Sequence, residues 1–114
     1  MIVAIAAAIL ACTVLAGVVM ASRRTRRLPV PLGAGLAHGG AAVTGLVLLA
    51  TGVFGAEQPV TVNAALLMFA LAFIGGLFLL LFRLDDGKPP GFMIFMHGSA
   101  AVVGLGLLIA GLVH

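Results

Sequence analysis

The chain has 114 residues, of which 63% are hydrophobic and 8% are charged, whereas soluble domains are roughly 45–50% apolar and 25% charged. So few charged side chains cannot cover the surface of a soluble domain, and the mean hydropathy of +1.34 is typical of a chain whose main solvent is lipid. The composition therefore excludes a soluble globular protein. It indicates an integral membrane protein with the lipid bilayer as its first partner.

Four apolar stretches, at 1–21, 30–54, 62–82 and 92–113, are each long enough to cross the ~30 Å hydrocarbon layer as a helix. Charged and turn-forming residues separate them at 22–31, 55–59 and 83–90. Because these connections are short, consecutive helices should be antiparallel neighbours. We therefore predict an all-α fold, an integral membrane four-helix bundle that forms a single transmembrane domain over 1–114.

The charges predict the orientation of this bundle. All six basic residues lie in or beside the first and third connections, and the middle connection carries only Glu57. The positive-inside rule then predicts cytoplasmic basic loops and external termini, in a bacterial inner membrane. The basic residues lie at connections and the chain has no Trp or Tyr for base stacking, so we expect no nucleic-acid partner.

The second half of the sequence resembles the first half at a shift of 59 positions, which aligns His38 with His97 and Arg24 with Arg83. The same shift superposes further pairs: Gly17 with Gly76, Pro31 with Pro90, Gly45 with Gly104, and Gly52 with Gly111. We predict two copies of one transmembrane hairpin, about 1–54 and about 60–114. Two such copies share an orientation and are related by an approximate two-fold axis along the membrane normal.

His38 and His97 are candidate functional residues, because ionisable side chains inside a membrane span are expensive to bury. Each histidine begins a run of glycines at steps of seven, which return to nearly the same helix face. Adjacent alanines widen this face of small residues, which admits a neighbouring helix or a planar ligand. The members of the two faces are Gly45, Ala41 and Ala42 after His38, and Gly104, Ala100 and Ala101 after His97.

Two neutral imidazoles at equal depth on facing helices suit the two axial positions of a haem iron. Arg24 and Arg83 lie at the membrane boundary nearest the histidines, where cations pair with haem propionates. We therefore predict a haem b site with His38 and His97 as iron ligands. The other candidate cofactor-binding residues are Gly45, Gly104, Ala41, Ala42, Ala100, Ala101, Arg24 and Arg83.

The dipeptides His38-Gly39 and His97-Gly98, each followed by small residues, resemble the histidine-bearing helices of small four-helix membrane b-type cytochromes. The resemblance covers the second and fourth predicted helices. It implies one-electron transfer, with a quinone or a redox protein as partner. The sequence contains no hydrolase or phosphate-loop motif, so the chemistry expected is that of an electron carrier at most.

Other interpretations of the histidines remain open. They could line a metal or proton path in a small channel or transporter subunit, with the glycine faces packing helices across a homodimer. They could instead be structural and form hydrogen bonds with Ser99, Thr44 or a backbone carbonyl. Finally, the set Met68, Met93 and Met96 with His97 is a candidate soft site for Cu(I).

Overall fold

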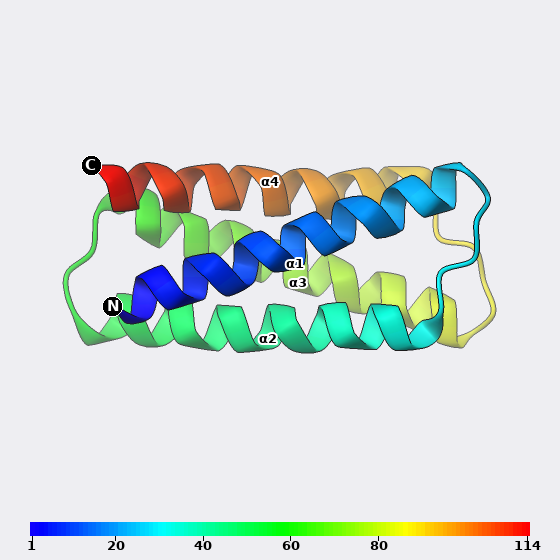
Figure 1. Ribbon diagram of the computed structural model, residues 1–114, viewed down its shortest axis with the longest axis horizontal. Coiled ribbons are helices and arrows are strands. Elements are labelled where there is room, and N and C mark those ends of the chain that lie inside the picture. The colour runs from blue at the N-terminus through cyan, green and yellow to red at the C-terminus, as the bar shows by residue number, and fades with distance from the viewer.

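The computed structural model describes residues 1–114 and consists of four α-helices without strands (Figure 1). The helices are α1 (Ile2–Thr25), α2 (Leu32–Gly55), α3 (Val60–Leu84) and α4 (Gly91–Val113). Each is long and apolar enough to cross a membrane. The predicted all-α class and the four helices of membrane-spanning length are therefore confirmed.

Proline residues and left-handed turns set the helix ends. α2, α3 and α4 each begin directly after a proline, at Pro31, Pro59 and Pro90. Proline lacks the N–H that a helix interior requires, but its fixed φ suits a helix start. Just beyond α1 and α3, Arg27 and Asp86 adopt positive φ values of 56° and 53°. A residue in this conformation cannot continue a helix, so the chain turns sharply after α1 and α3.

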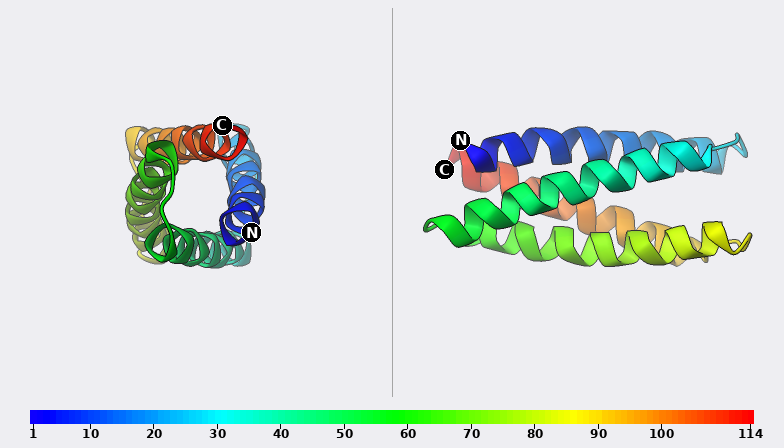
Figure 2. Two further views of the ribbon diagram at one scale, coloured as in Figure 1. Left: turned by 90° about the vertical axis from the view of Figure 1, so that its left-hand side faces the viewer. Right: turned by 90° about the horizontal axis from the view of Figure 1, so that it is seen from below.

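The helices form a four-membered ring, as the end-on view in Figure 2 shows. α1 and α3 each pack against both α2 and α4, and packing within the hairpins α1–α2 and α3–α4 is more extensive than packing between them. The diagonal pairs, α1 with α3 and α2 with α4, do not touch backbone to backbone. The interior of the ring is therefore filled only by side chains.

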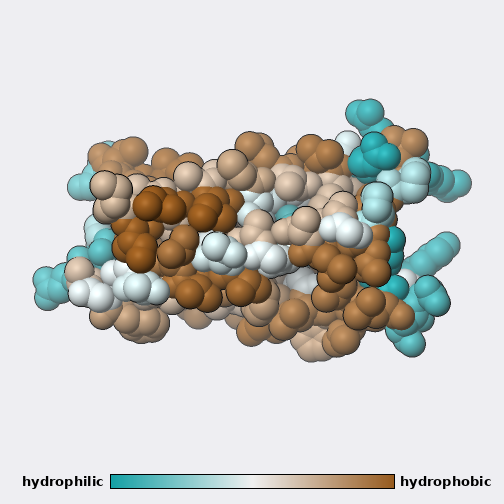
Figure 3. Space-filling model, turned by 60° about the horizontal axis from the view of Figure 1, so that its bottom comes forward, coloured by the Kyte–Doolittle hydropathy of each residue, from teal (hydrophilic) through white to brown (hydrophobic).

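The two ends of the bundle differ in charge. Both termini and the connection between α2 and α3 lie at one end, the terminal end, and the other two connections lie at the opposite end (Figure 1). This second end, the basic end, carries all six Lys and Arg residues. Brown, hydrophobic side chains cover much of the length between the hydrophilic ends (Figure 3).

The apolar core occupies only part of the bundle. Every buried residue lies within 3–13, 45–52, 62–72 or 104–108, which together form the half nearer the terminal end. Leu49 and Leu108 are completely buried there, and Val62 is 1% exposed. We call this region the packed half and the remainder, nearer the basic end, the open half. The open half contains both histidines of interest.

Candidate functional site

His38 and His97 approach each other across the interior of the open half. His38 belongs to α2 and His97 to α4, which are diagonal helices. Their ring centroids are 6.3 Å apart, and the ring planes are inclined at 74°. Since the two helices do not touch at this level, the imidazoles themselves bridge the bundle interior.

Two glycines on the other diagonal pair seat the imidazole rings. A Cβ atom built on Gly17 of α1 would lie 3.0 Å from Cε1 of His38, and one built on Gly76 of α3 would lie 3.0 Å from Cε1 of His97. Any larger residue at either position must push a ring aside. The 59-residue repeat aligned these glycines, but sequence reasoning gave them no role in the site.

The histidines differ in their hydrogen bonds. Nδ1 of His97 lies 2.7 Å from the carbonyl oxygen of Ala72 in α3. With its proton on Nδ1, His97 donates to that carbonyl and keeps a lone pair on Nε2 for a metal ion. The backbone of Thr13 stands beside the His38 ring, but the contact lacks hydrogen-bond geometry, and the buried Nδ1 of His38 has no partner.

A cavity of about 320 Å³ lies between the four helices and includes both imidazoles in its lining. Leu10 and Phe69 of the packed half lie at its inner limit, and Arg24 and Arg83 line it at the basic end. This volume is at the lower end of the range for small-molecule pockets, about 300–1,000 Å³. The cavity is lined mostly by apolar residues and receives few polar groups, which is the composition of a cofactor site.

Glycines next to the histidines leave additional room. Gly39 and Gly98 line the cavity, and a Cβ atom at either would meet no other atom within 4 Å. The residue that follows each histidine therefore has free space around it.

The structure separates the predicted cofactor-binding residues into two groups. Both histidines, both arginines, Ala42 and Ala101 line the cavity. Four others, Ala41, Ala100, Gly45 and Gly104, are not among its lining residues. Instead, a Cβ at Gly45 would meet the Leu10 side chain of α1, and one at Gly104 would meet Phe69 of α3. These glycines permit close helix packing within each hairpin, because a side chain at either position would collide with the neighbouring helix.

Other candidate groups lie away from the imidazoles. Met68, Met93 and Met96 do not line the cavity, and Met96 is 63% exposed. Thr44 donates to the carbonyl of Gly40 within its own helix. No group of three or more His, Cys, Asp or Glu side chains is positioned to hold a metal ion. The histidine pair and the two arginines are thus the predicted chemical groups that the fold brings to one cavity.

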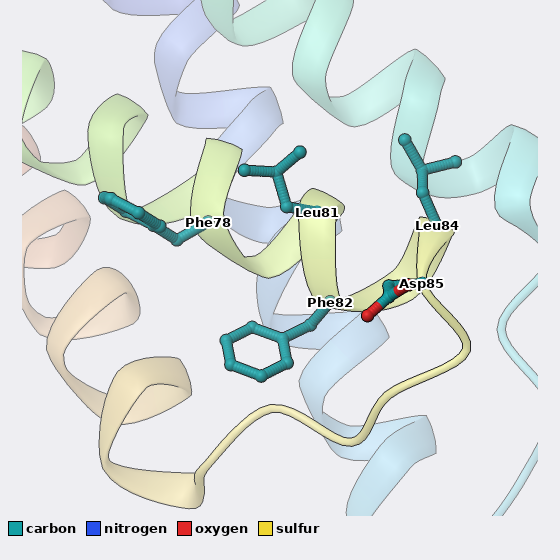
Figure 4. Close-up of a pocket in the computed structure, with 5 residues that line it drawn as sticks. All are labelled: Phe78, Leu81, Phe82, Leu84 and Asp85. Carbon is teal, nitrogen blue, oxygen red and sulfur yellow. The ribbon is translucent and has the colours of Figure 1, made fainter.

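A second, more open hollow of about 480 Å³ lies at the basic end of α3. Its lining side chains are spread along the helix and the turn after it (Figure 4): Phe78, Leu81, Phe82, Leu84 and Asp85. Its only ionisable group is Asp85. We therefore take the histidine cavity as the candidate functional site. Comparison with family models, curated proteins and solved structures finds no match to this chain.

Proposed function

We propose that this chain is a membrane b-type haem protein that carries single electrons, with haem b held between His38 and His97. The observation that carries the proposal is the pair of imidazoles from diagonal helices, 6.3 Å apart, in the lining of an interior cavity. Imidazole nitrogen is a common axial ligand of haem iron, and bundle interiors are common cofactor sites.

The spacing of the rings fits one metal ion between them. A metal–imidazole bond is about 2 Å long and the nitrogen lies about 1 Å from its ring centre, so two imidazoles on opposite sides of one ion have centroids ~6 Å apart. The observed separation is 6.3 Å. At this spacing both imidazoles would reach one metal ion held between them.

The surroundings of the rings also suit a flat anionic cofactor. Gly39 and Gly98 leave space beside the imidazoles, and Arg24 and Arg83 offer cations for two propionates at the basic end. Bound haem supplies the one-electron chemistry. The chain would orient His97 through the Ala72 carbonyl and exclude water with the apolar walls of the cavity.

The same proposal includes the membrane setting. The bundle is 43 Å long, which matches the ≈ 40–45 Å of a bilayer with its headgroups. We propose two duplicated hairpins in a bacterial inner membrane, with the basic loops in the cytoplasm and both termini outside. Reporter fusions to the C-terminus test the orientation, and a cytoplasmic reporter signal would contradict it. A quinone or a redox protein is the proposed electron partner.

The channel alternative receives less support from the packing. Beyond the inner limit of the cavity at Leu10 and Phe69, the interior is occupied by Leu49, Val62 and Leu108. These apolar side chains leave no polar route along the bundle axis. The cytochrome interpretation requires no such route.

A visible absorption spectrum tests the proposal. Protein produced with ample haem and purified in detergent should show the Soret and α bands of a six-coordinate, low-spin haem. Replacing both His38 and His97 with Ala should abolish these bands. His114→Ala is the matched control, because His114 is exposed at the C-terminus, and should leave the spectrum unchanged. Wild-type protein without a Soret band would contradict the proposal.

A further inference from the structure

His38 and His97 occupy corresponding positions 59 residues apart, yet they are held differently. Nδ1 of His97 is fixed by the 2.7 Å contact with the Ala72 carbonyl. Nδ1 of His38 is buried but has no hydrogen-bond partner, although the backbone of Thr13 lies beside the ring. A hydrogen bond therefore fixes the tautomer of His97, and none fixes the tautomer of His38.

The difference coincides with two departures from the repeat beside the rings. Ala72 corresponds to Thr13, which is the only buried polar residue of the protein. Thr13 is β-branched, and its hydroxyl donates to the carbonyl of Ile9 at 2.8 Å. On the neighbouring turn Gly17 and Gly76 come equally close to the respective rings, but Gly75, which lies beside His97, corresponds to Ala16. The changes from Ala72 to Thr13 and from Gly75 to Ala16 are thus the local differences beside the unbonded ring.

A hydrogen bond from the second ring nitrogen strengthens an imidazole as a metal ligand. It fixes the tautomer, holds the ring in position and increases the basicity of the ligating nitrogen. Loss of such a bond typically lowers metal affinity or activity by about 10–100-fold. The available space does not offset this difference, because Gly39 and Gly98 leave the same room beside both rings.

We infer that the pair is functionally unequal, with His97 the permanent ligand and His38 the displaceable one. The position that His38 fills can then accept a small neutral diatomic molecule, for which carbon monoxide is the probe. This inference rests on the proposed haem function. With ferrous haem bound, Nε2 of His38 would give up its bond to the iron and the carbon atom of the probe would form one in its place. No electron or proton is transferred.

Carbon monoxide titration of the reduced, haem-loaded protein tests this inequality. His38→Ala should retain haem and bind carbon monoxide more tightly than the wild type does. His97→Ala should lose haem about 10–100-fold more readily than His38→Ala, because its remaining ligand lacks the second hydrogen bond. Haem retention is measured by transfer to a haem-scavenging protein, so the readout does not depend on electron-transfer activity.

Exchanging the residues at the two carbonyl positions provides a matched pair of variants. Thr13→Ala should let His38 bond to the residue 13 carbonyl and weaken carbon monoxide binding by about tenfold. Ala72→Thr should make His97 displaceable as well and should strengthen carbon monoxide binding. Both variants keep all the ligands, so their effects are measurable even if a histidine variant fails to fold.

The outcomes separate the inference from the function on which it rests. Wild-type protein that binds no haem overturns both. Haem-loaded wild type whose two histidine variants release haem equally, and whose carbon monoxide affinity does not respond to Thr13→Ala, overturns only the inequality. Unequal haem release together with the predicted Thr13→Ala effect supports it.

Discussion

The packed half and the open half of this bundle use the same four helices for different purposes. In the packed half, Leu49, Leu108 and Val62 fill the interior, and their own side chains are almost completely inaccessible to solvent. In the open half no residue is buried, and the interior is a cavity lined by two imidazoles. Glycine changes its role between them: Gly45 and Gly104 admit neighbouring apolar side chains, whereas Gly17 and Gly76 admit histidine rings.

This contrast shows how a small bundle can contain a cavity and still have a defined fold. Close packing at one end fixes how the helices cross. The other end is then free to hold polar side chains and empty volume. We therefore expect substitutions in the packed half to change stability, except at Thr13 and Ala72, which also line the cavity, and substitutions in the open half to change binding.

The largest expected effect on stability comes from truncating the packed interior. Leu49→Ala and Leu108→Ala should each lower the free energy of unfolding by about 2–5 kcal/mol, because each leaves a cavity in a tightly filled region. Unfolding in mixed detergent, followed by circular dichroism, measures the loss. Val47→Ala is the control, since Val47 is 58% exposed. If His97→Ala destabilised the cofactor-free protein as much, the division between the halves would be wrong.

Replacing a glycine with alanine should also distinguish the two halves, with a smaller change in the free energy of unfolding than the leucine truncations. A Cβ at Gly52 would lie 2.5 Å from Cγ2 of Val3, whereas a Cβ at Gly39 would meet nothing within 4 Å. Gly52→Ala should therefore lower the free energy of unfolding by about 1–3 kcal/mol through overpacking. Gly39→Ala should leave it unchanged or raise it slightly, because alanine favours helix. Equal changes in the free energy of unfolding for Gly52→Ala and Gly39→Ala would contradict the helix crossing described above.

The fold could be predicted from the sequence largely because proline and charge interrupt the apolar stretches. The stretch predicted to begin at residue 30 begins as a helix at Leu32, directly after Pro31. The all-helical class needed only the composition and the length of each stretch. The exact start of a helix depends on proline, because proline cannot lie in a helix interior and α2, α3 and α4 each begin at the residue after one.

The site was predicted only in part. The repeat and the rarity of ionisable residues were sufficient to select His38 and His97. Periodicity alone could not show that Gly45 packs against Leu10 instead of lining a cavity, because that depends on the crossing of α1 and α2. The role of Gly76 could not be predicted for the same reason, because it depends on how α3 and α4 cross. The repeat register contained a usable signal, since Gly17 and Gly76 are 59 residues apart like the histidines.

Gly76→Ala should affect binding more than stability. The new Cβ would lie 3.0 Å from Cε1 of His97 and would displace the ring by a few tenths of an ångström. We expect haem retention to fall by about tenfold, which is the lower limit for disturbing the support of a metal ligand. Gly106→Ala is the matched control, because its Cβ would meet nothing within 4 Å and Gly106 does not line the cavity. Loss of stability without loss of haem would assign Gly76 to helix packing instead.

The smallest expected effect concerns Arg83, at the edge of the open half. Nη2 of Arg83 donates to the carbonyl oxygen of Val30 at 2.8 Å, which ties the end of α3 to the connection between α1 and α2. Arg83→Gln removes this bond, and because the site is partly exposed the free energy of unfolding should fall by only about 1 kcal/mol. Arg24→Gln removes an exposed cation of the same cavity and serves as the control for charge.

If both changes weaken haem binding but only Arg83→Gln lowers stability, the arginines share a role in binding and Arg83 alone has a role in the fold. If Arg83→Gln destabilised the bundle as strongly as Leu108→Ala, the open half would be a structural region in its own right, and the contrast between the two halves would fail.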